Sequence, residues 1–466
     1  MNRRRTSRLA AVTAFLAVAA GMSAPPAGAA AANVTVDFTT VERPVSPQSF
    51  GLDVTGYGYG HYVTNDTREQ AMVQGRFGTM RMGLKYAVPH DPASAIVANG
   101  AGADTVVTGD QWVSAIKARG AEPVVIVPED AVDAANMVRH FNTGSAPNRV
   151  TRWIVGNEPG DITAYATRFN AAYDAMKAVD PAIKVGGPAL AHPAMGDIRT
   201  FLKTSGTRTD FVDFHKYGEG REPGKPGGKL VCDSQLLAET VEWENDVNQV
   251  RSIIQEEAPA RAGKIDIQVG EINSSWSVDN DPPELAQCGN IGTEPFQYRN
   301  AAIWWAASVW GHLLKAGAQG FVYGDKNGAL GLLYDQPNDE RPAYARNGAG
   351  LDERMPIYQG VGFFTGQQDT SLARFGSSLV RAQTTLAGVE VYASANPKVV
   401  VLVNKSTTPV TAVVGVGTGV TKAAAVQKSG GTASYQLPAS LGTLPVSQGT
   451  VTVSLPGPSL TQLAIS

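Results

Sequence analysis

The stretch Trp153-Ile-Val-Gly-Asn-Glu-Pro159 indicates how this chain folds. A β-rich apolar run ends on two polar residues and a proline. Apolar residues at three- and four-residue steps then follow over residues 163–180, which predicts a helix. A short strand followed at once by a helix is typical of a parallel sheet covered by helices.

The same unit occurs eight times between residues 48 and 325. The β-rich runs are Ser49–Val54, Gly78–Gly83, Glu122–Val127, Arg152–Asn157, Ile183–Pro188, Asp210–His215, Ile265–Gly270 and Gly320–Asp325. Eight strands alternating with helices over about 300 residues predict a (β/α)8 TIM barrel, an α/β fold. We assign residues 47–350 to this barrel.

The segments before and after the predicted barrel have the sequence pattern of β-strands. Residues 351–466 contain short strand patterns separated by Gly, Pro and Ser, without a helical period, and this predicts an appended C-terminal β-sandwich domain. Residues 33–46 alternate like a strand but precede the first barrel strand. We expect this N-terminal strand to join the sandwich.

Residues 1–29 have the pattern of a secretory signal peptide. Four arginines precede an apolar run, Leu9–Gly21, that is too short to span a bilayer, and Ala27-Gly28-Ala29 is a cleavage pattern. Removing the four arginines changes the formal charge from −3 to −7, because 35 basic residues then face 42 acidic ones. We expect a secreted, extracellular, mildly acidic protein without a nucleic-acid partner and, after cleavage, without a membrane segment.

The chain has two cysteines, Cys232 and Cys288. In an exported protein an even pair suggests one disulfide, and two free thiols are the alternative. The cysteines and the six histidines show none of the spacings of a metal site. We therefore expect no metal and no cofactor.

Two glutamates fall where this fold places its active site. Glu158 follows the fourth strand and Glu271 ends the seventh, and active sites of such barrels lie at the C-terminal ends of the strands. A protonated carboxyl that donates to a leaving oxygen and an ionised one that attacks the anomeric carbon are what glycoside cleavage needs. Carboxyl groups about 5–5.5 Å apart give retention and about 6.5–9.5 Å inversion, and the sequence leaves this gap open.

Five further residues can support the pair. Asn157 can hydrogen-bond a substrate hydroxyl, and Arg81 at the end of the second strand can pair with the ionised glutamate. His215 and Tyr217 share one face of the sixth strand, so that Tyr217 can donate to the nucleophile. Trp276 can stack on a sugar ring. The alternatives are an ion pair in the barrel wall for Arg81, a structural role for His215, and packing for the two aromatic residues.

Three short motifs resemble glycoside hydrolase clan A: Gly156-Asn-Glu-Pro159, His215-Lys-Tyr217 and Gly270-Glu271. With its appended sandwich the chain is similar to families 39, 51, 79 and 30 of that clan, and family 39 is favoured. The resemblance implies a retaining enzyme with Glu158 as acid/base and Glu271 as nucleophile. Many clan members place a Trp at the end of the eighth strand, whereas this chain has Tyr323 and Asp325. Substrate contacts at that strand therefore do not carry over.

These observations predict a secreted retaining glycoside hydrolase that acts on a cell-wall or extracellular polysaccharide or oligosaccharide. A non-catalytic carbohydrate-binding protein on the same fold is one alternative, and a transglycosylase using the same residues is another. An acidic sugar stays a second candidate for the substrate. The loop after the sixth strand carries basic residues that can meet such a sugar, Lys216, Arg221, Lys225 and Lys229, together with the acidic residues Glu219 and Glu222.

Overall fold

The computed structural model describes most of the chain after the predicted signal peptide. The described residues are 31–54, 73–99, 107–144, 148–219, 232–276, 296–324, 333–334, 353–368, 370–430 and 437–466. The predicted signal peptide lies outside them. Residues Ala32–Ser466 form one compact unit.

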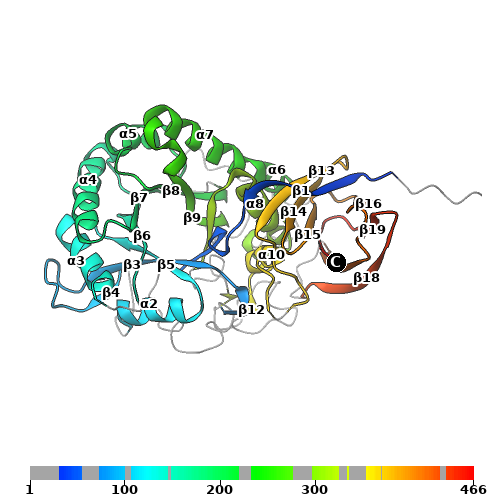
Figure 1. Ribbon diagram of the computed structural model, residues 1–466, viewed down its shortest axis with the longest axis horizontal. Helices are drawn as coiled ribbons and strands as arrows, with labels where there is room; N and C mark the ends of the chain where they lie inside the picture. Colours follow the sequence, from blue (N-terminus) through cyan, green and yellow to red (C-terminus); the bar gives the residue numbers. More distant parts are fainter. Residues whose placement is uncertain are drawn as a thin grey trace, which may run out of the picture. The chain divides into compact units, whose positions relative to one another are not determined.

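Eight parallel strands close into a ring (Figure 1). In ring order they are β2 (Phe50–Asp53), β3 (Thr79–Tyr86), β5 (Glu122–Val127), β6 (Arg152–Val155), β7 (Lys184–Leu190), β8 (Phe211–Glu219), β9 (Asp266–Ser275) and β10 (Gln319–Tyr323). The ring closes where β10 pairs with β2, with Gly320 opposite Phe50. The predicted (β/α)8 barrel is confirmed, and each of the eight predicted runs supplies one strand.

Helices cover the outside of the ring, as Figure 1 shows for α3, α4, α5 and α7. Their bounds are α2 (Gly109–Ala118), α3 (Ala131–Asn142), α4 (Ile162–Val179), α5 (Met195–Ser205), α6 (Asp233–Ala238), α7 (Glu242–Glu257), α8 (Ala301–Ala316) and α10 (Pro356–Thr365). Aspartates start two of them, since Asp130 and Asp161 accept hydrogen bonds from the first free backbone N–H groups of α3 and α4.

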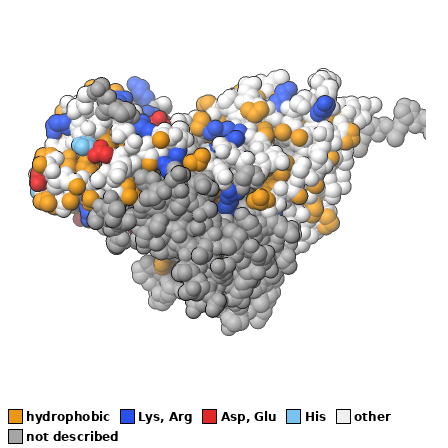
Figure 2. Space-filling model, turned by 90° about the horizontal axis from the view of Figure 1, so that it is seen from below, with side chains coloured by type: hydrophobic (Ala, Val, Ile, Leu, Met, Phe, Trp, Pro, Cys, Tyr) orange, Lys and Arg blue, Asp and Glu red, His pale blue; other side chains and the backbone are white. Residues whose placement is uncertain are grey.

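Shorter elements complete the barrel. They are the 3-10 helices η1 (Pro47–Ser49), η3 (Glu239–Val241), η4 (Pro259–Lys264) and η6 (Phe296–Tyr298), strand β4 (Ile96–Ala98) beside β3, and the pair β11 (Leu333–Tyr334) and β12 (Glu353–Arg354). Among the described helices none has the length and apolarity needed to cross a membrane. On the face seen in Figure 2, the described hydrophobic side chains lie in scattered groups among polar ones.

The C-terminal domain is built from β-strands, as predicted, but residues 351–466 also include helix α10, which was not predicted. Its strands are β1 (Val34–Pro44), β13 (Ser378–Thr384), β14 (Val389–Ala395), β15 (Val399–Asn404), β16 (Val410–Gly415), β17 (Lys422–Ser429), β18 (Ala439–Ser447), β19 (Thr450–Leu455) and β20 (Ser459–Ile465). They form one closed sheet rather than two separate sheets. The N-terminal strand β1 is antiparallel to β13 and parallel to β16, and Val34 and Val414 are buried in the core that the strands enclose.

Helix α8 joins the barrel to the β-domain. It contacts β9 and β10 of the ring as well as β15 and β20 of the β-domain, and almost every residue of it is buried. At Gly311 a Cβ would lie 2.1 Å from the ring of Tyr392, so only glycine allows this approach. Helix α10 packs against α8 and is buried along its whole length. The sequence pattern did not predict α10, because a helix covered on every side has no polar face.

Candidate active site

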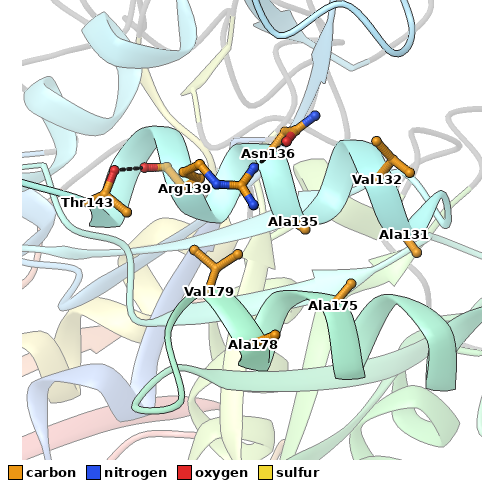
Figure 3. A pocket seen from close by; sticks show the side chains of 9 residues that line it. All are labelled: Ala131, Val132, Ala135, Asn136, Arg139, Thr143, Ala175, Ala178 and Val179. Carbon is orange, nitrogen blue, oxygen red and sulfur yellow. Dashed lines mark hydrogen bonds between the residues drawn. The ribbon is translucent and has the colours of Figure 1, made fainter.

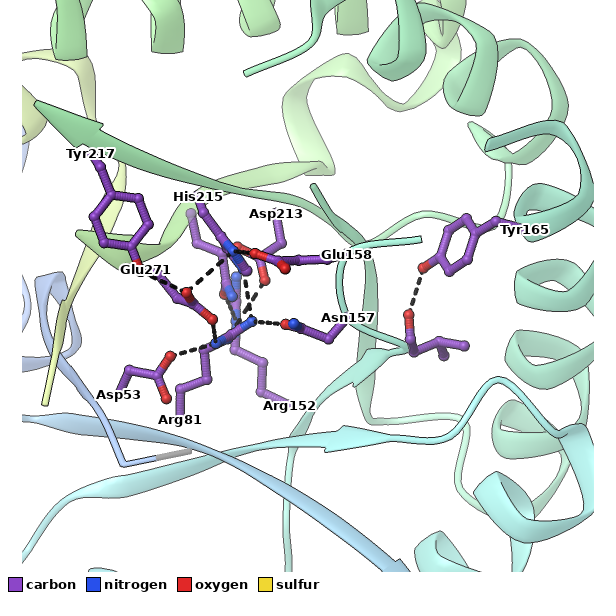
Figure 4. A network of polar contacts seen from close by, with 12 residues as sticks. Asp53, Arg81, Arg152, Asn157, Glu158, Tyr165, Asp213, His215, Tyr217 and Glu271 are labelled. Atoms are coloured by element: carbon purple, nitrogen blue, oxygen red, sulfur yellow. Dashed lines mark hydrogen bonds and ion pairs between the residues drawn. The ribbon is translucent and has the colours of Figure 1, made fainter. Parts of the chain in front are cut away.

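A buried arginine connects the strands at the centre of the ring. Arg81 on β3 is wholly buried, and its Nη1 donates to Oδ2 of Asp53 and, at 3.0 Å, to Oε1 of Glu271. Its Nη2 donates to Oδ1 of Asn157 at 2.7 Å and lies 2.9 Å from Nε2 of His215 (Figure 4). One guanidinium therefore fixes side chains from β2, β8, β9 and the turn after β6.

Strand alternation brings two residues of β8, Asp213 and His215, to this guanidinium and a third, Tyr217, to Glu271. Asp213, His215 and Tyr217 are spaced by two residues and so share one face of the strand. His215 pairs in register with Glu271 on β9. At Gly270 a Cβ would lie 2.5 Å from Oδ1 of Asp213, so glycine allows β9 to approach this carboxylate.

The strands that carry the site are longer than the sequence suggested. Glu271 and His215 were expected at strand ends, but β9 continues to Ser275 and β8 to Glu219. Arg81 likewise lies within β3. The extension follows from pairing, because β8 and β9 stay hydrogen-bonded to each other as far as Glu219 and Ser275.

Glu158 reaches the site from a tight turn after β6. Gly156 has φ 70° and Glu158 has φ 51°, a left-handed conformation that is rare for a residue with a side chain. Such conformations cost roughly 1–3 kcal/mol and persist only where neighbours impose them. Here the backbone N–H of Glu158 donates to the carbonyl of Ala189 on β7 at 2.9 Å. The turn leaves the Glu158 side chain 45% exposed, whereas that of Glu271 is 10% exposed.

The hydrogen bonds of His215 assign its proton. An arginine N–H can only donate, so Nε2 of His215 accepts from Arg81 and the ring proton lies on Nδ1. Nδ1 then donates to Oε1 of Glu158 at 2.8 Å, and Oε2 of Glu271 is 3.4 Å away. Burial lowers the pKa of His215, but Glu271 and Glu158 raise it on balance. Protonating Nε2 would break its contact with Arg81.

Glu271 is held in its ionised form. Burial raises the pKa of its carboxyl, but His215, Arg81 and a hydrogen bond from Tyr217 outweigh burial and lower that pKa on balance. The Tyr217 hydroxyl donates to Oε2 of Glu271 at 2.8 Å. A carboxylate oxygen of Glu271, one of Glu158 and a nitrogen of His215 lie within 4.8 Å of one another. The two carboxyl groups are thus close enough to act on one bond.

Two groups among the described residues have ligand atoms close enough to hold a cation. One group is Glu158, His215 and Glu271. The guanidinium of Arg81, which pairs with Glu271, would repel a cation bound there. The other is an exterior cluster of one histidine and two aspartates, His90, Asp130 and Asp133. Neither arrangement by itself indicates a metal centre.

A cavity of about 620 Å³ opens beside Glu158. It is lined by Glu158, Ala191, His192, Pro193, Lys216, Tyr217 and Trp276. Trp276 directly follows β9 and is 39% exposed. Lys216 forms an ion pair with Asp246 and lies 4.5 Å from the centre of the Trp243 ring. The positive charge of Lys216 is therefore already paired within the protein.

A second hollow lies on the outside of the barrel, between α3 and α4 (Figure 3). Its lining is mostly apolar and includes Ala135 and Ala175, with Arg139, Asn136 and Thr143 as its polar members. It contains no carboxylate. The cavity beside Glu158 is therefore the better candidate for chemistry.

The structure brings most of the predicted site residues together. The network unites Arg81, Asn157, Glu158, His215, Tyr217 and Glu271, and Trp276 lines the cavity. Tyr323 lies edge-on to Tyr217 with ring centres 6.4 Å apart, and Asp325 lies outside the described residues. Cys232 precedes α6, whereas Cys288 lies outside the described residues, so the disulfide stays a prediction.

Sequence reasoning missed two carboxylates of the network, Asp53 and Asp213. Both are wholly buried, and Oδ2 of Asp213 lies 3.8 Å from Nε of Arg81. Asp53 is the last residue of β2, a strand-end position that was used as a signal elsewhere in the chain. Asp213 precedes His215 by two residues, and the rule that placed Tyr217 beside His215 also applies to it.

Comparisons with known proteins agree with this geometry. The family described as Glycosyl hydrolases family 39 matches residues 139–286, which include both glutamates. These findings support a clan A glycoside hydrolase similar to family 39. No curated protein sequence matches the chain.

Solved structures of glycoside hydrolases share the fold along nearly the whole chain. A crystal structure of an arabinofuranosidase has a TM-score of 0.69 at 15% identity, covering 94% of this chain and 100% of that one. An α-L-arabinofuranosidase from Thermotoga maritima in complex with arabinose has a TM-score of 0.67 at 14% identity, covering 93% and 99%. A family 44 xyloglucanase from Paenibacillus polymyxa has a TM-score of 0.61 at 13% identity, with the same coverage. Identities this low show a common fold.

Proposed function

We propose that this protein is a secreted retaining glycosidase in which Glu271 is the nucleophile and Glu158 the acid/base. The observation that carries the proposal is the pair of carboxylate oxygens within 4.8 Å of each other. Oxygens this close lie below the inverting gap of about 6.5–9.5 Å and support the retaining mechanism, in which the carboxyl groups are about 5–5.5 Å apart. Secretion rests on the predicted signal peptide, and N-terminal sequencing of exported protein tests it.

The two environments fit the two roles. Glu271 is buried and ionised, as attack on an anomeric carbon requires, and Arg81 and Tyr217 hold its two oxygens. As the bond from Glu271 to that carbon forms, the bond to the leaving oxygen breaks and Glu158 gives this oxygen its proton. Water then attacks the glycosyl ester, Glu158 accepts the proton of this water, and Glu271 leaves as carboxylate. The hydrogen bond from Nδ1 of His215 to Oε1 of Glu158 holds this carboxyl in place for both steps.

For the substrate we favour a neutral sugar of a cell-wall or extracellular polysaccharide or oligosaccharide. Two of the structures with this fold are arabinofuranosidases and one is a xyloglucanase. Lys216, the lysine of the cavity wall, is paired with Asp246, which disfavours recruitment of an acidic sugar by this residue. Arg221, Lys225 and Lys229 lie outside the described residues.

Chemical rescue tests the two roles. A panel of aryl glycosides that includes α-L-arabinofuranosides and β-D-xylosides first identifies a substrate. Glu271→Ala should abolish its turnover, and azide should restore activity with a glycosyl azide of inverted configuration. Glu158→Ala with azide should give the retained configuration, because the nucleophile is still present. Glu129→Gln is the control, since Glu129 also follows a barrel strand but pairs with Arg168 outside the network.

The outcomes separate the alternatives. Near-normal activity of Glu271→Ala would contradict its role as nucleophile. Failure of the wild-type protein to cleave any glycoside or polysaccharide, combined with binding to one of them, would favour a non-catalytic carbohydrate-binding protein. Products transferred mainly to an added sugar acceptor in place of water would favour a transglycosylase.

A further inference from the structure

We infer that Asp53 is a positioning residue that takes the larger share of the charge of Arg81 and thereby leaves Glu271 reactive. This inference rests on the proposed role of Glu271 as nucleophile. The side chain of Asp53 is wholly buried against Arg81, so we assign it a role through Arg81 rather than on substrate.

One nitrogen of Arg81 serves both carboxylates. Nη1 donates to Oδ2 of Asp53 at 2.5 Å and to Oε1 of Glu271 at 3.0 Å (Figure 4). Arg81 and Asp53 are both wholly buried, so neither can exchange its partner for water. The pair of Arg81 and Asp53 is therefore fully enclosed, whereas Glu271 is 10% exposed and has the longer contact with Nη1.

The charges around Arg81 are unbalanced. Asp53, Asp213 and Glu271 all lie near one guanidinium. Asp213 is the most distant of the three, at 3.8 Å, and burial raises its pKa, which weakens it as a competitor for the positive charge. Among the described carboxylates near Arg81, Asp53 is thus the stronger competitor of Glu271 for its charge.

This limit matters for the proposed reaction. Glu271 loses its negative charge as it bonds to the anomeric carbon, so any cation that binds the free carboxylate more strongly than the transition state slows the attack. A full ion pair with Arg81 would be such a ground-state interaction. By sharing Nη1, Asp53 weakens the hold of Arg81 on Glu271, while Arg81 still helps to keep Glu271 ionised.

The test is Asp53→Asn, which keeps an oxygen that can accept from Nη1 but removes the negative charge. Glu271 then faces more of the charge of Arg81, so its pKa falls. The acid limb of kcat/KM, which reports the free enzyme, should move to lower pH by about one unit. With a phenyl glycoside of the identified sugar, whose poor leaving group makes the first step limiting, kcat at the plateau should fall about tenfold while KM changes little.

The matched control is Asp266→Asn. Asp266 also pairs with a barrel arginine, Arg152, and lies on the same strand as Glu271, but its side chain is 43% exposed and its ion pair is with Arg152 and not with Arg81. This variant should leave the acid limb and the plateau of kcat in place. An acid limb that stays or rises in folded Asp53→Asn would overturn the inference.

Two further variants keep the test decisive. Asp53→Ser is also neutral and should move the acid limb in the same direction if Asp53→Asn does not fold. If both neutral variants fail to fold while Asp53→Glu folds and is active, the charge of Asp53 serves stability, and the inference is wrong. If Glu271→Ala is active, the proposed function itself fails, and that result does not depend on Asp53.

Discussion

Two buried histidines, His215 in the barrel and His312 on α8 beside the β-domain, each lie between glutamates but differ in what faces the second ring nitrogen. Nδ1 of His215 meets Glu158, and its Nε2 meets an arginine. His312 meets glutamates on both sides, Glu244 at 2.7 Å from Nδ1 and Glu390 at 3.3 Å from Nε2. His312 can donate from both nitrogens and carry a charge, whereas His215 in this arrangement has to keep one lone pair.

The two surroundings also differ in their balance of charge. Around His312, two carboxylates face two cations, since Lys405 also pairs with Glu390. Burial raises the pKa of Glu390, but His312 and Lys405 outweigh burial and bring it to about 2. Around His215, the carboxylates of Asp53, Asp213, Glu158 and Glu271 outnumber Arg81. The charges of the cluster around His312 balance, and this cluster joins the barrel to the β-domain. The cluster around His215 has an excess of carboxylates beside a cavity, so that a carboxyl group there can bind or release a proton.

The largest effect on activity should come from replacing the planar guanidinium of Arg81, whose nitrogens donate to several side chains at once. Arg81→Lys keeps the charge but cannot donate to Asp53, Asn157 and Glu271 from one plane, so kcat/KM should fall about a thousandfold. Because Arg81 lowers the pKa of Glu271, the acid limb of kcat/KM should move to higher pH. The measurement is the pH profile of kcat/KM. Activity within tenfold of wild type on an unmoved acid limb would contradict the central place of Arg81.

The interface cluster should respond in stability and not in catalysis. Glu390→Gln leaves Lys405 without its counterion and His312 with Glu244 alone, so the free energy of unfolding should fall by roughly 3 kcal/mol. The folded variant should keep its kcat/KM. Denaturant unfolding and kinetics on the same preparation measure both quantities. A large loss of kcat/KM in folded protein would mean that the two clusters are coupled.

Two tyrosines, one in each cluster, make the same kind of hydrogen bond and allow a direct comparison of the two clusters. Tyr217 and Tyr392 each donate a hydroxyl hydrogen bond of 2.8 Å to a glutamate, Glu271 and Glu390 respectively. Tyr217→Phe should lower kcat/KM about tenfold and raise its acid limb, because the lost hydrogen bond lowers the pKa of Glu271. Tyr392→Phe should cost about 1 kcal/mol of stability and leave kcat/KM unchanged. Equal kinetic effects of the two changes would remove the distinction.

The smallest expected effect is a pH dependence of stability at the interface. Burial lowers the pKa of His312, but Glu244 and Glu390 raise it on balance above its ordinary 6.5. The stability that this shift contributes is full below pH 6.5 and is lost as the pH rises through the raised pKa. The difference in Tm between wild type and His312→Gln should therefore shrink by about 1–2 °C above pH 6.5. A difference that grows with pH would show that His312 is neutral in the folded protein.

The fold could be predicted because its sequence pattern, a β-rich run followed by a helix, is short and recurs along the chain. Each β-rich run and the helix after it can be read without knowing the rest of the chain, as at Trp153–Pro159. Glu158 and Glu271 could be singled out for the same reason, since the barrel directs one end of every strand to one face. Helix α10 could not, because neighbours cover all of its faces and the pattern that marks a surface helix is missing.

The missed parts of the site depend on contacts across the ring. Asp53 and Asp213 resemble any acid in or after a strand until Arg81 is seen between them. The length of β9 depends on how far β8 accompanies it, and the tautomer of His215 depends on a guanidinium 134 positions away in sequence. Such features belong to pairs of residues, and a single strand pattern contains only one member of each pair.

The position of helix α8 between the two domains limits how the chain can be cut into fragments or recombined with other chains. Its buried surface is shared between the strands of the barrel and those of the β-domain, and Tyr392 occupies the space beside Gly311. A chain cut between the two domains would expose a helix that has almost no polar surface, and we expect such a fragment to aggregate. Recombination that exchanges only one of the two domains should seldom give a soluble product. We therefore expect the barrel and the β-domain to be inherited together, although the described residues of the proposed catalytic network lie in the barrel.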